Sequence, residues 1–273
     1  LWDHRGGELI DERDSYSRLV EYAEAHRFDH SLNETLHRTQ TFEGRPRRLA
    51  VGRFDFHFAD GVRPVTAELT YATGTLRVTL SSGASVSLVV ALKQNIMYVD
   101  DPSHAITRVS LHPASDFPKV RDFNGKRGVA PYELLEDGWR IVLPEDPGMT
   151  FRAVRTDYGF KVFTDNDGDD TSRAEQIAFT ADWWGKFCAK TARVTTPDDW
   201  WNRFYDFNLY KLGAATCPFG KASGLQGPWH EEYQEAKWSG DFHFNVNVQM
   251  IYGPLAQLGV PEHMLPLFAQ FES

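Results

Sequence analysis

Residues 75–92 read TLRVTLSSGASVSLVVAL, in which two short apolar segments lie on either side of Ser82 and Gly83. Successive side chains of a strand point to opposite faces, so a period of two predicts a strand with one buried face. Serine followed by glycine is typical of a turn. The stretch therefore predicts two short strands joined by a turn.

The same pattern continues on both sides, from about residue 48 to residue 182. Further turn residues follow at Thr73-Gly74 and Tyr158-Gly159, and no helical period intervenes. Many short strands of this kind are typical of antiparallel sheets packed as a β-sandwich. The predicted strands are 48–58, 65–72, 75–80, 85–92, 106–111, 139–143, 150–155, 159–164 and 175–181. A capping pair, Asp14 and Ser15, predicts one helix before them, ending near Phe28.

Composition excludes several classes of function. The chain has 273 residues and a net charge of −9, so it carries no basic surface suited to nucleic acid or to an anionic membrane. It contains no run of about 18 apolar residues, which argues against a membrane-spanning helix. No signal peptide is visible and the chain starts at Leu1 rather than Met, so the compartment is left open: cytoplasmic, periplasmic or secreted.

An acidic stretch, DNDGDD, covers residues 165–170. Asp165, Asp167 and Asp169 match the first, third and fifth positions of a calcium loop, but Asp170 and Gln176 stand where such a loop has glycine and glutamate. A hairpin tip between two strands explains the stretch equally well. We expect no cofactor, with calcium at these three aspartates as the alternative.

The pattern becomes helical after residue 182. Pro197 and Asp198 mark a helix start, and apolar residues follow at helical spacing to Leu212. Two shorter helical patterns lie at 248–252 and 261–271. We therefore expect a β-sandwich domain with an N-terminal helix over 1–182, a linker over 183–197, and a helical unit over 198–273.

Residues 241–250, DFHFNVNVQM, alternate strictly. An extended conformation would place the apolar residues on one face and His243, Asn245 and Asn247 on the other. Asparagine is depleted in strands, so two on one face need an explanation. One explanation makes Asn247 the N-cap of a helix that starts at Val248. The other makes these polar residues part of an active site, and the two are compatible.

The segment 200–273 resembles family 95 glycoside hydrolases, which are inverting α-L-fucosidases and related α-L-galactosidases. The family has a Leu-Gln-Gly-x-Trp loop, a second tryptophan, and an Asn-x-Asn motif that leads into a helix with a methionine. The matching residues are Leu225, Gln226, Gly227, Trp229, Trp238, Asn245, Asn247 and Met250. The stretches FYDFNLYKLGAAT and PLFAQFE resemble the helices on either side of this loop. Over residues 1–182 the resemblance is one of architecture.

The resemblance implies an N-terminal β-sandwich followed by an (α/α) toroid of six hairpins, of which this chain would contain the truncated start. It also implies that Asn247 positions and deprotonates the attacking water and that Asn245 helps to hold it. His243, Trp229, Trp238 and Gln226 would bind the sugar. The substrate would be an oligosaccharide or polysaccharide with α-L-fucosyl or α-L-galactosyl groups.

The family's acid glutamate comes from a later part of the toroid, so this chain alone is expected to be inactive. We assign no acid role to the loop carboxylates Glu231, Glu232, Glu235 and Asp241. We also expect exposed apolar side chains at Ile251, Leu255 and Leu258, and a companion C-terminal polypeptide that covers them. The alternatives are a glycoside phosphorylase of the same architecture and a noncatalytic carbohydrate-binding protein.

Overall fold

A computed structural model describes residues 2–3, 16–25, 46–164, 172–227 and 230–272. Its largest element is an eight-stranded sheet in which every neighbouring pair is antiparallel. In spatial order the strands are β4 (Pro64–Thr70), β5 (Thr75–Leu80), β6 (Ser85–Val90), β7 (Ile96–Asp100), β12 (Gly159–Thr164), β11 (Met149–Arg155), β10 (Gly138–Ile141) and β9 (Glu133–Leu134). The antiparallel sheet predicted from the alternating pattern is confirmed.

A second ladder packs against this sheet. Strands β3 (Gly52–Phe58) and β8 (Ile106–Pro113) pair with each other. The Phe54 ring of β3 lies 4.7 Å from the Trp139 ring of β10, and the Phe56 ring lies 5.5 Å from the Phe160 ring of β12. The apolar residues of the two layers form the main core. A short pair, β1 (Trp2–Asp3) and β2 (Arg47–Arg48), lies beside them.

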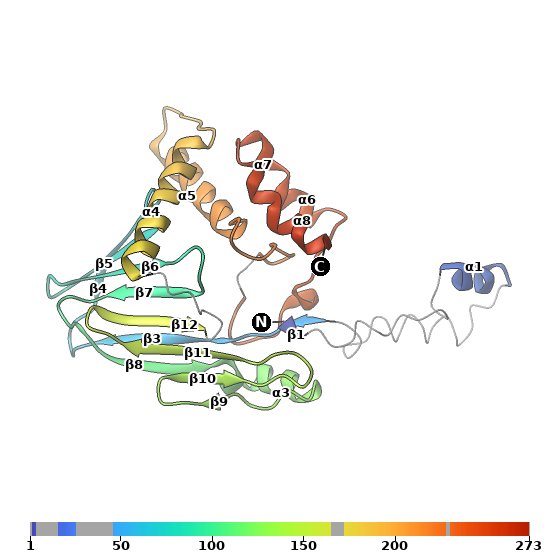
Figure 1. Ribbon diagram of the computed structural model, residues 1–273, viewed down its shortest axis with the longest axis horizontal. Helices are drawn as coiled ribbons and strands as arrows, with labels where there is room; N and C mark the ends of the chain where they lie inside the picture. The colour runs from blue at the N-terminus through green and yellow to red at the C-terminus, as the bar shows by residue number, and fades with distance from the viewer. Residues whose placement is uncertain (1, 4–15, 26–45, 165–171, 228–229, 273) are drawn as a thin grey trace.

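In Figure 1 the helices gather above the β4–β7 end of the large sheet. They are α4 (Arg173–Lys190), α5 (Asp199–Ala215), α6 (Asn247–Tyr252), α7 (Pro254–Gln257) and α8 (Leu265–Glu272), with 3₁₀ turns η4 (Lys237–Gly240) and η5 (Pro261–Met264). The predicted start of α5 is confirmed, because the Asp198 side chain accepts a hydrogen bond of 2.8 Å from the Trp200 N–H. Helix α1 (Tyr16–Glu24) lies apart from all of these, and α3 (Pro118–Lys126) with its preceding turn η3 (Ala114–Asp116) packs beside β10.

One predicted strand is wrong. Residues 175–181 belong to helix α4, which continues through the first half of the predicted linker to Lys190. A capping box starts this helix: the Ser172 hydroxyl accepts from the Glu175 N–H, and the Glu175 carboxylate accepts from the Ser172 N–H. This reciprocal pair satisfies two backbone donors, and Gln176, Thr180 and Trp184 then lie buried at a spacing of four residues.

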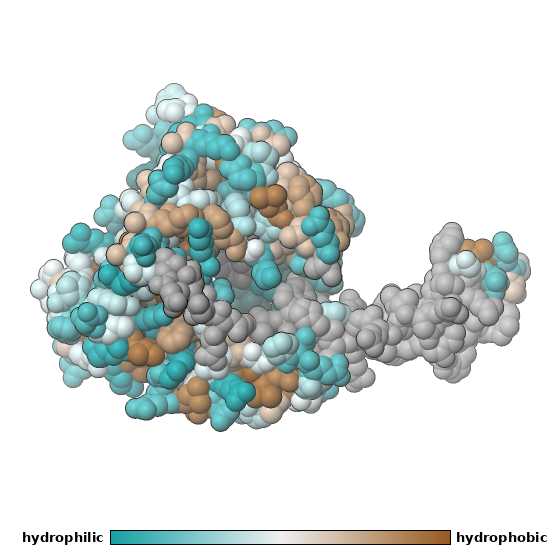
Figure 2. All heavy atoms as spheres, viewed as in Figure 1, coloured by the Kyte–Doolittle hydropathy of each residue, from teal (hydrophilic) through white to brown (hydrophobic). Residues whose placement is uncertain are grey.

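The short helices α6, α7 and α8 pack on α4 and α5 around a common core. Its fully buried members include Trp184, Phe187, Tyr252, Leu255 and Leu267. The expectation that Leu255 is exposed is therefore wrong, and Ile251 and Leu258 are half-buried. Other apolar side chains of this part are exposed instead, and Figure 2 shows apolar surface over these helices. They are Phe244, Val246, Met250, Leu265, Phe268 and Phe271.

Candidate functional site

The long segment between α5 and α6 folds so that two of its turns meet. The Leu225 N–H donates a hydrogen bond of 2.9 Å to the Asp241 carbonyl, and the Gly227 N–H donates one of 3.0 Å to the Gly224 carbonyl. A Cβ atom at Gly224 would lie 3.0 Å from both the Gly240 and Asp241 carbonyl oxygens. Glycine therefore permits the close approach that places Gln226 beside the residues around Asp241.

This segment is held against the sheets by arginines. The Arg48 Nη1 atom donates a hydrogen bond of 2.6 Å to the Gly227 carbonyl. Burial lowers the pKa of Arg48. Two ion pairs add to this contact: Arg53 with Glu232, and Arg47 with Glu235 at 3.7 Å. These contacts hold the segment against strands β2 and β3, although in the sequence it connects two helices, α5 and α6.

Three successive residues at the end of the segment adopt left-handed backbone conformations. The φ angles are 47° at Trp238, 63° at Ser239 and 68° at Gly240. Two of them are not glycine, and such residues rarely adopt positive φ unless their surroundings enforce it. Ser239 and Gly240 are buried, whereas the Trp238 side chain is 67% exposed. The backbone is thus fixed while a large aromatic ring faces solvent.

The exposed tryptophan lies next to a histidine and a carboxylate. The Trp238 and His243 ring centroids are 6.4 Å apart, with an interplanar angle of 64°. The His243 Nε2 atom lies 2.7 Å from the Asp241 Oδ1 atom. If Nε2 carries a proton, the carboxylate orients the imidazole and leaves Nδ1 available to another partner. The structure therefore brings together two of the predicted sugar-binding residues.

Asn245 and Asn247 lie in a turn and at a helix start, not in a strand. The predicted extended segment is wrong, because residues 244–246 form a turn and α6 starts at Asn247. The Val248 N–H donates to the His243 carbonyl at 3.1 Å, and the Gln249 side chain donates to the Phe244 carbonyl. The N-cap explanation is also wrong, since Val246 occupies the cap position without a side-chain hydrogen bond.

The polar residues nevertheless stay accessible without the strand. Asn245 is exposed, and His243 and Asn247 are half-buried. Of the five apolar residues expected to face a core, Phe244, Val246 and Met250 are exposed instead, whereas Val248 is buried and Phe242 is half-buried. The turn therefore presents polar and apolar side chains together at the surface.

Gln226, another predicted binding residue, lines a polar cavity of about 460 Å³ with His230, Glu231, Glu232 and Lys237. Burial, followed by the nearby Arg48 charge, lowers the pKa of His230. This imidazole is therefore neutral near pH 7 and can accept as well as donate a hydrogen bond. Trp229, the remaining predicted residue, lies outside the described residues.

The loop carboxylates have partners that suit ionised groups. A hydrogen bond from its own backbone N–H and another from Arg53 lower the pKa of Glu232. A general acid needs the opposite shift, because it must hold a proton at the working pH. Glu231 accepts a hydrogen bond from Gln234. These contacts fit a structural role at the rim of the cavity.

Asp165, Asp167 and Asp169, the residues of the calcium alternative, lie outside the described residues. Within the described part of the chain, no three His, Cys, Asp or Glu side chains come close enough together to hold a metal ion. Within the same residues, no helix has the length and apolar character needed to cross a membrane.

The helical part of the chain is similar to known glycoside hydrolases. Residues 187–273 match the model of the glycosyl hydrolase family 95 catalytic domain. A 67-residue stretch is 37% identical to a probable alpha-fucosidase A of Aspergillus niger. The resemblance drawn from the Leu-Gln-Gly and Asn-x-Asn motifs is thereby confirmed. The aligned stretch covers 24% of this chain and only 8% of that relative.

Proposed function

We propose that residues 198–272 form one wall of the sugar site of an inverting glycoside hydrolase that acts on α-L-fucosyl or related α-L-galactosyl glycans. The match of residues 187–273 to a catalytic domain carries the proposal, because it covers the whole segment from Gln226 to Asn247. The exposed Trp238 ring beside the His243–Asp241 pair supports it.

In this proposal Trp238 and His243 bind the sugar. Sugar rings have an apolar face that packs on an aromatic ring, and the largely exposed Trp238 indole offers such a platform. Asp241 orients the His243 ring, so that the free ring nitrogen can accept a hydrogen bond from a sugar hydroxyl. Gln226 adds an amide from the adjacent turn.

Asn247 and Asn245 would act on the attacking water. Inverting hydrolysis places the acid and base groups roughly 6.5–9.5 Å apart, so that a water molecule fits between the base and the sugar. A neutral amide is a poor base, but its carbonyl can accept a hydrogen bond from water and align the oxygen with the anomeric carbon. We assign positioning and deprotonation to Asn247, which requires a supporting carboxylate, and a holding role to Asn245.

The general acid would come from polypeptide outside these 273 residues. The same polypeptide would cover the exposed apolar side chains of α6 and α8, among them Met250, Phe268 and Phe271. Surface of this kind is expensive to leave in water and is typical of an interface. The companion polypeptide would therefore supply the remaining helices of the six-hairpin toroid.

The test is hydrolysis of aryl α-L-fucosides and α-L-galactosides by the full-length protein, with the product anomer followed by NMR. An inverting enzyme releases the β-anomer first, since water attacks the face opposite the leaving group. Initial release of the α-anomer would contradict inversion. Cleavage only in the presence of inorganic phosphate would support a glycoside phosphorylase, and sugar binding without turnover would support a carbohydrate-binding protein.

A further inference from the structure

A second cavity, of about 690 Å³, lies between the large sheet and the helices, and it shares no lining residue with the one at Gln226. Its floor is one face of β4 to β7, with Leu69, Leu76, Leu88, Val90 and Met97. The registers Leu69–Leu76, Leu76–Leu88 and Val90–Met97 place these side chains on the same face. Cavities of about 300–1,000 Å³ are typical of small-molecule sites.

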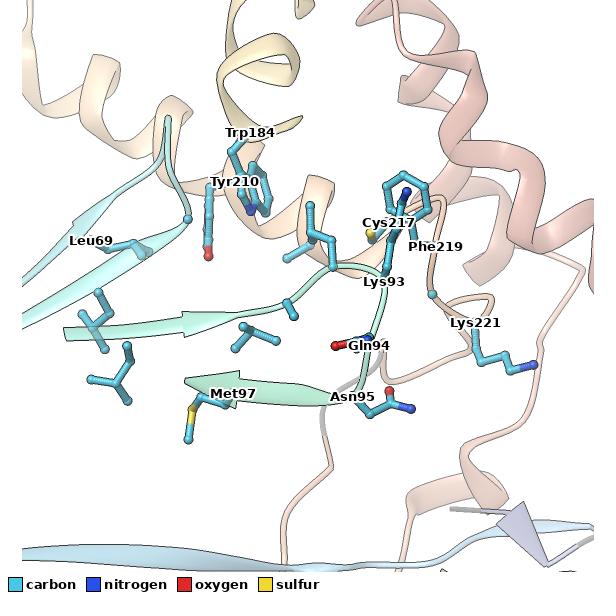
Figure 3. A pocket seen from close by; sticks show the side chains of 18 residues that line it. Leu69, Lys93, Gln94, Asn95, Met97, Trp184, Tyr210, Cys217, Phe219 and Lys221 are labelled. Atoms are coloured by element: carbon cyan, nitrogen blue, oxygen red, sulfur yellow. The ribbon is translucent and has the colours of Figure 1, made fainter. Parts of the chain in front are cut away.

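The roof is aromatic. Trp184 of α4 and Tyr210 of α5 stack with their ring centroids 4.4 Å apart, and Tyr71 stacks on the other side of Tyr210 at 5.3 Å. In Figure 3 the Tyr210 hydroxyl points from the helix toward the sheet. Ala214, Cys217 and Phe219 continue the roof. An apolar ligand body would therefore lie between a branched aliphatic floor and stacked rings.

The protein covers the floor only in part, since Leu88 and Met97 also pack against the core that the sheet shares with β3. Val90 is 59% exposed, whereas its neighbour Val89, on the opposite face of the sheet, is 6% exposed. Leu69, Leu76, Leu88 and Met97 are also only half-buried. Water over such a concave apolar surface is unfavourable, so an apolar ligand gains free energy by displacing it.

The charges of the lining have one sign. Lys93 and Lys221 are both lining residues on the same side of the view in Figure 3, and no carboxylate is among the described lining residues. The Lys93 Nζ atom lies 4.0 Å from the Phe179 ring centroid and 5.7 Å from that of Phe219. Neither lysine has an ion-pair partner within the described part of the chain, although the net charge of the protein is −9.

We propose that this cavity binds an amphiphilic anion, with an apolar body over the β4–β7 floor and a carboxylate or similar head at Lys93 and Lys221. A sugar fits less well, because few polar groups of the lining, chiefly Gln94, Asn95 and the Tyr210 hydroxyl, could pair with its hydroxyls. The site is independent of the proposed glycosidase activity.

The test is calorimetric titration of the full-length protein with decanoate and, in parallel, with uncharged decanol. Wild-type protein should bind decanoate saturably with a Kd below about 1 mM. The double variant Lys93→Glu/Lys221→Glu should bind it at least about tenfold more weakly, because two attractive charges become repulsive. Lys119→Glu/Lys126→Glu makes the same change of net charge on α3 and should leave the Kd unchanged.

A filling substitution locates the ligand. Ala214→Trp should abolish decanoate binding because it occupies the cavity, whereas Ala215→Trp, one position along α5 and outside the lining, should preserve it. Decanoate should also slow alkylation of Cys217, which lines the cavity, but not of Cys188, which does not. Burial raises the pKa of both thiols, so both react slowly enough for comparison at mildly alkaline pH.

Three results would overturn the proposal: no saturable binding, equal affinity of the charge-reversed and control variants for decanoate, or decanoate that leaves Cys217 alkylation unchanged. Equal loss of decanol and decanoate binding in the charge-reversed variant would also count against it, since the head group would then play no part. None of these outcomes depends on hydrolysis of a glycoside.

Discussion

The Nδ1 atom of His263 lies 2.9 Å from the Oγ1 atom of Thr216, and this pair joins η5 to the C-terminal end of α5. The Thr216 hydroxyl donates to the Leu212 carbonyl at 2.8 Å, so it accepts its other hydrogen bond from the His263 Nδ1–H. His263 is 1% exposed and packs against Trp183 and Phe187. Burial lowers its pKa to about 4.

The first prediction concerns stability and pH. The folded state keeps His263 neutral down to about pH 4, whereas the unfolded chain binds a proton at this residue below about pH 6.5. Stability should therefore fall as the pH is lowered from 6.5 to 4, by at most about 3 kcal/mol. Urea denaturation of wild type and His263→Gln at pH 7 and 4.5 checks this.

His263→Gln keeps a donor for Thr216 but does not titrate, so its stability should depend less on pH. His104→Asn, at an exposed left-handed turn position, should behave as wild type. Equal pH dependence in wild type and His263→Gln would contradict the prediction.

A second prediction compares two glycines with positive φ. A Cβ atom at Gly240 would lie 2.6 Å from Arg48 Cδ, whereas none of the atoms around Gly61 comes within 4 Å. Both alanine substitutions carry the cost of a left-handed alanine, roughly 1 kcal/mol. Gly240→Ala should cost about 1–3 kcal/mol more, because Arg48 must leave Gly227. Thermal denaturation of both variants gives this difference, and equal losses would show that the contact between Arg48 and the loop is unimportant.

The third prediction concerns a hydrogen bond that holds the start of the segment between α5 and α6. The Ser223 N–H donates to the Tyr252 hydroxyl at 2.6 Å, and both groups are buried. Tyr252→Phe leaves a buried N–H without a partner, which should cost about 1–3 kcal/mol. Tyr71→Phe, on a half-buried ring, should cost less than about 0.5 kcal/mol. Losses of the same size, measured by chemical denaturation, would exclude a special role for this bond.

Trp238 supplies a fourth prediction. If its exposed ring binds the sugar, Trp238→Ala in the full-length protein should raise KM about three- to tenfold. Trp200→Ala removes a similarly exposed tryptophan from α5 and should leave KM unchanged. Steady-state kinetics on an aryl α-L-fucoside distinguishes the two. An unchanged KM for Trp238→Ala would remove this residue from the site.

Much of the sheet could be predicted from the sequence because turn residues mark its strands. Strands β5 and β6 meet at Ser82-Gly83 as predicted, where the Gly83 φ angle is 86°. Strand β7 was missed, because its apolar residues show no clear alternation and both of its faces are covered. For helix α4 the signal was present in Ser172 and Glu175, but the alternation of Ile177 and Phe179 with smaller residues favoured a strand.

The residues of the candidate site stay a prediction, and their geometry could not be predicted from the sequence. The alternation in residues 241–250 predicts a strand only if a partner strand is available, and the described structure offers none there. The carbonyls of His243 and Phe244 are satisfied locally by Val248 and Gln249. The contact of Arg48 with Gly227 joins residues 179 positions apart, and no local pattern could reveal it.

In the proposed function Asn247 acts on the attacking water, and the kcat of Asn247→Ala in the full-length protein tests this role. Asn208→Ala is the control, because the Asn208 amide donates its hydrogen bond to the Phe204 carbonyl of its own helix. We expect kcat to fall by at least about a hundredfold in Asn247→Ala and to stay unchanged in Asn208→Ala, with the same melting temperature for both. A folded Asn247→Ala enzyme with near-normal kcat would contradict the account.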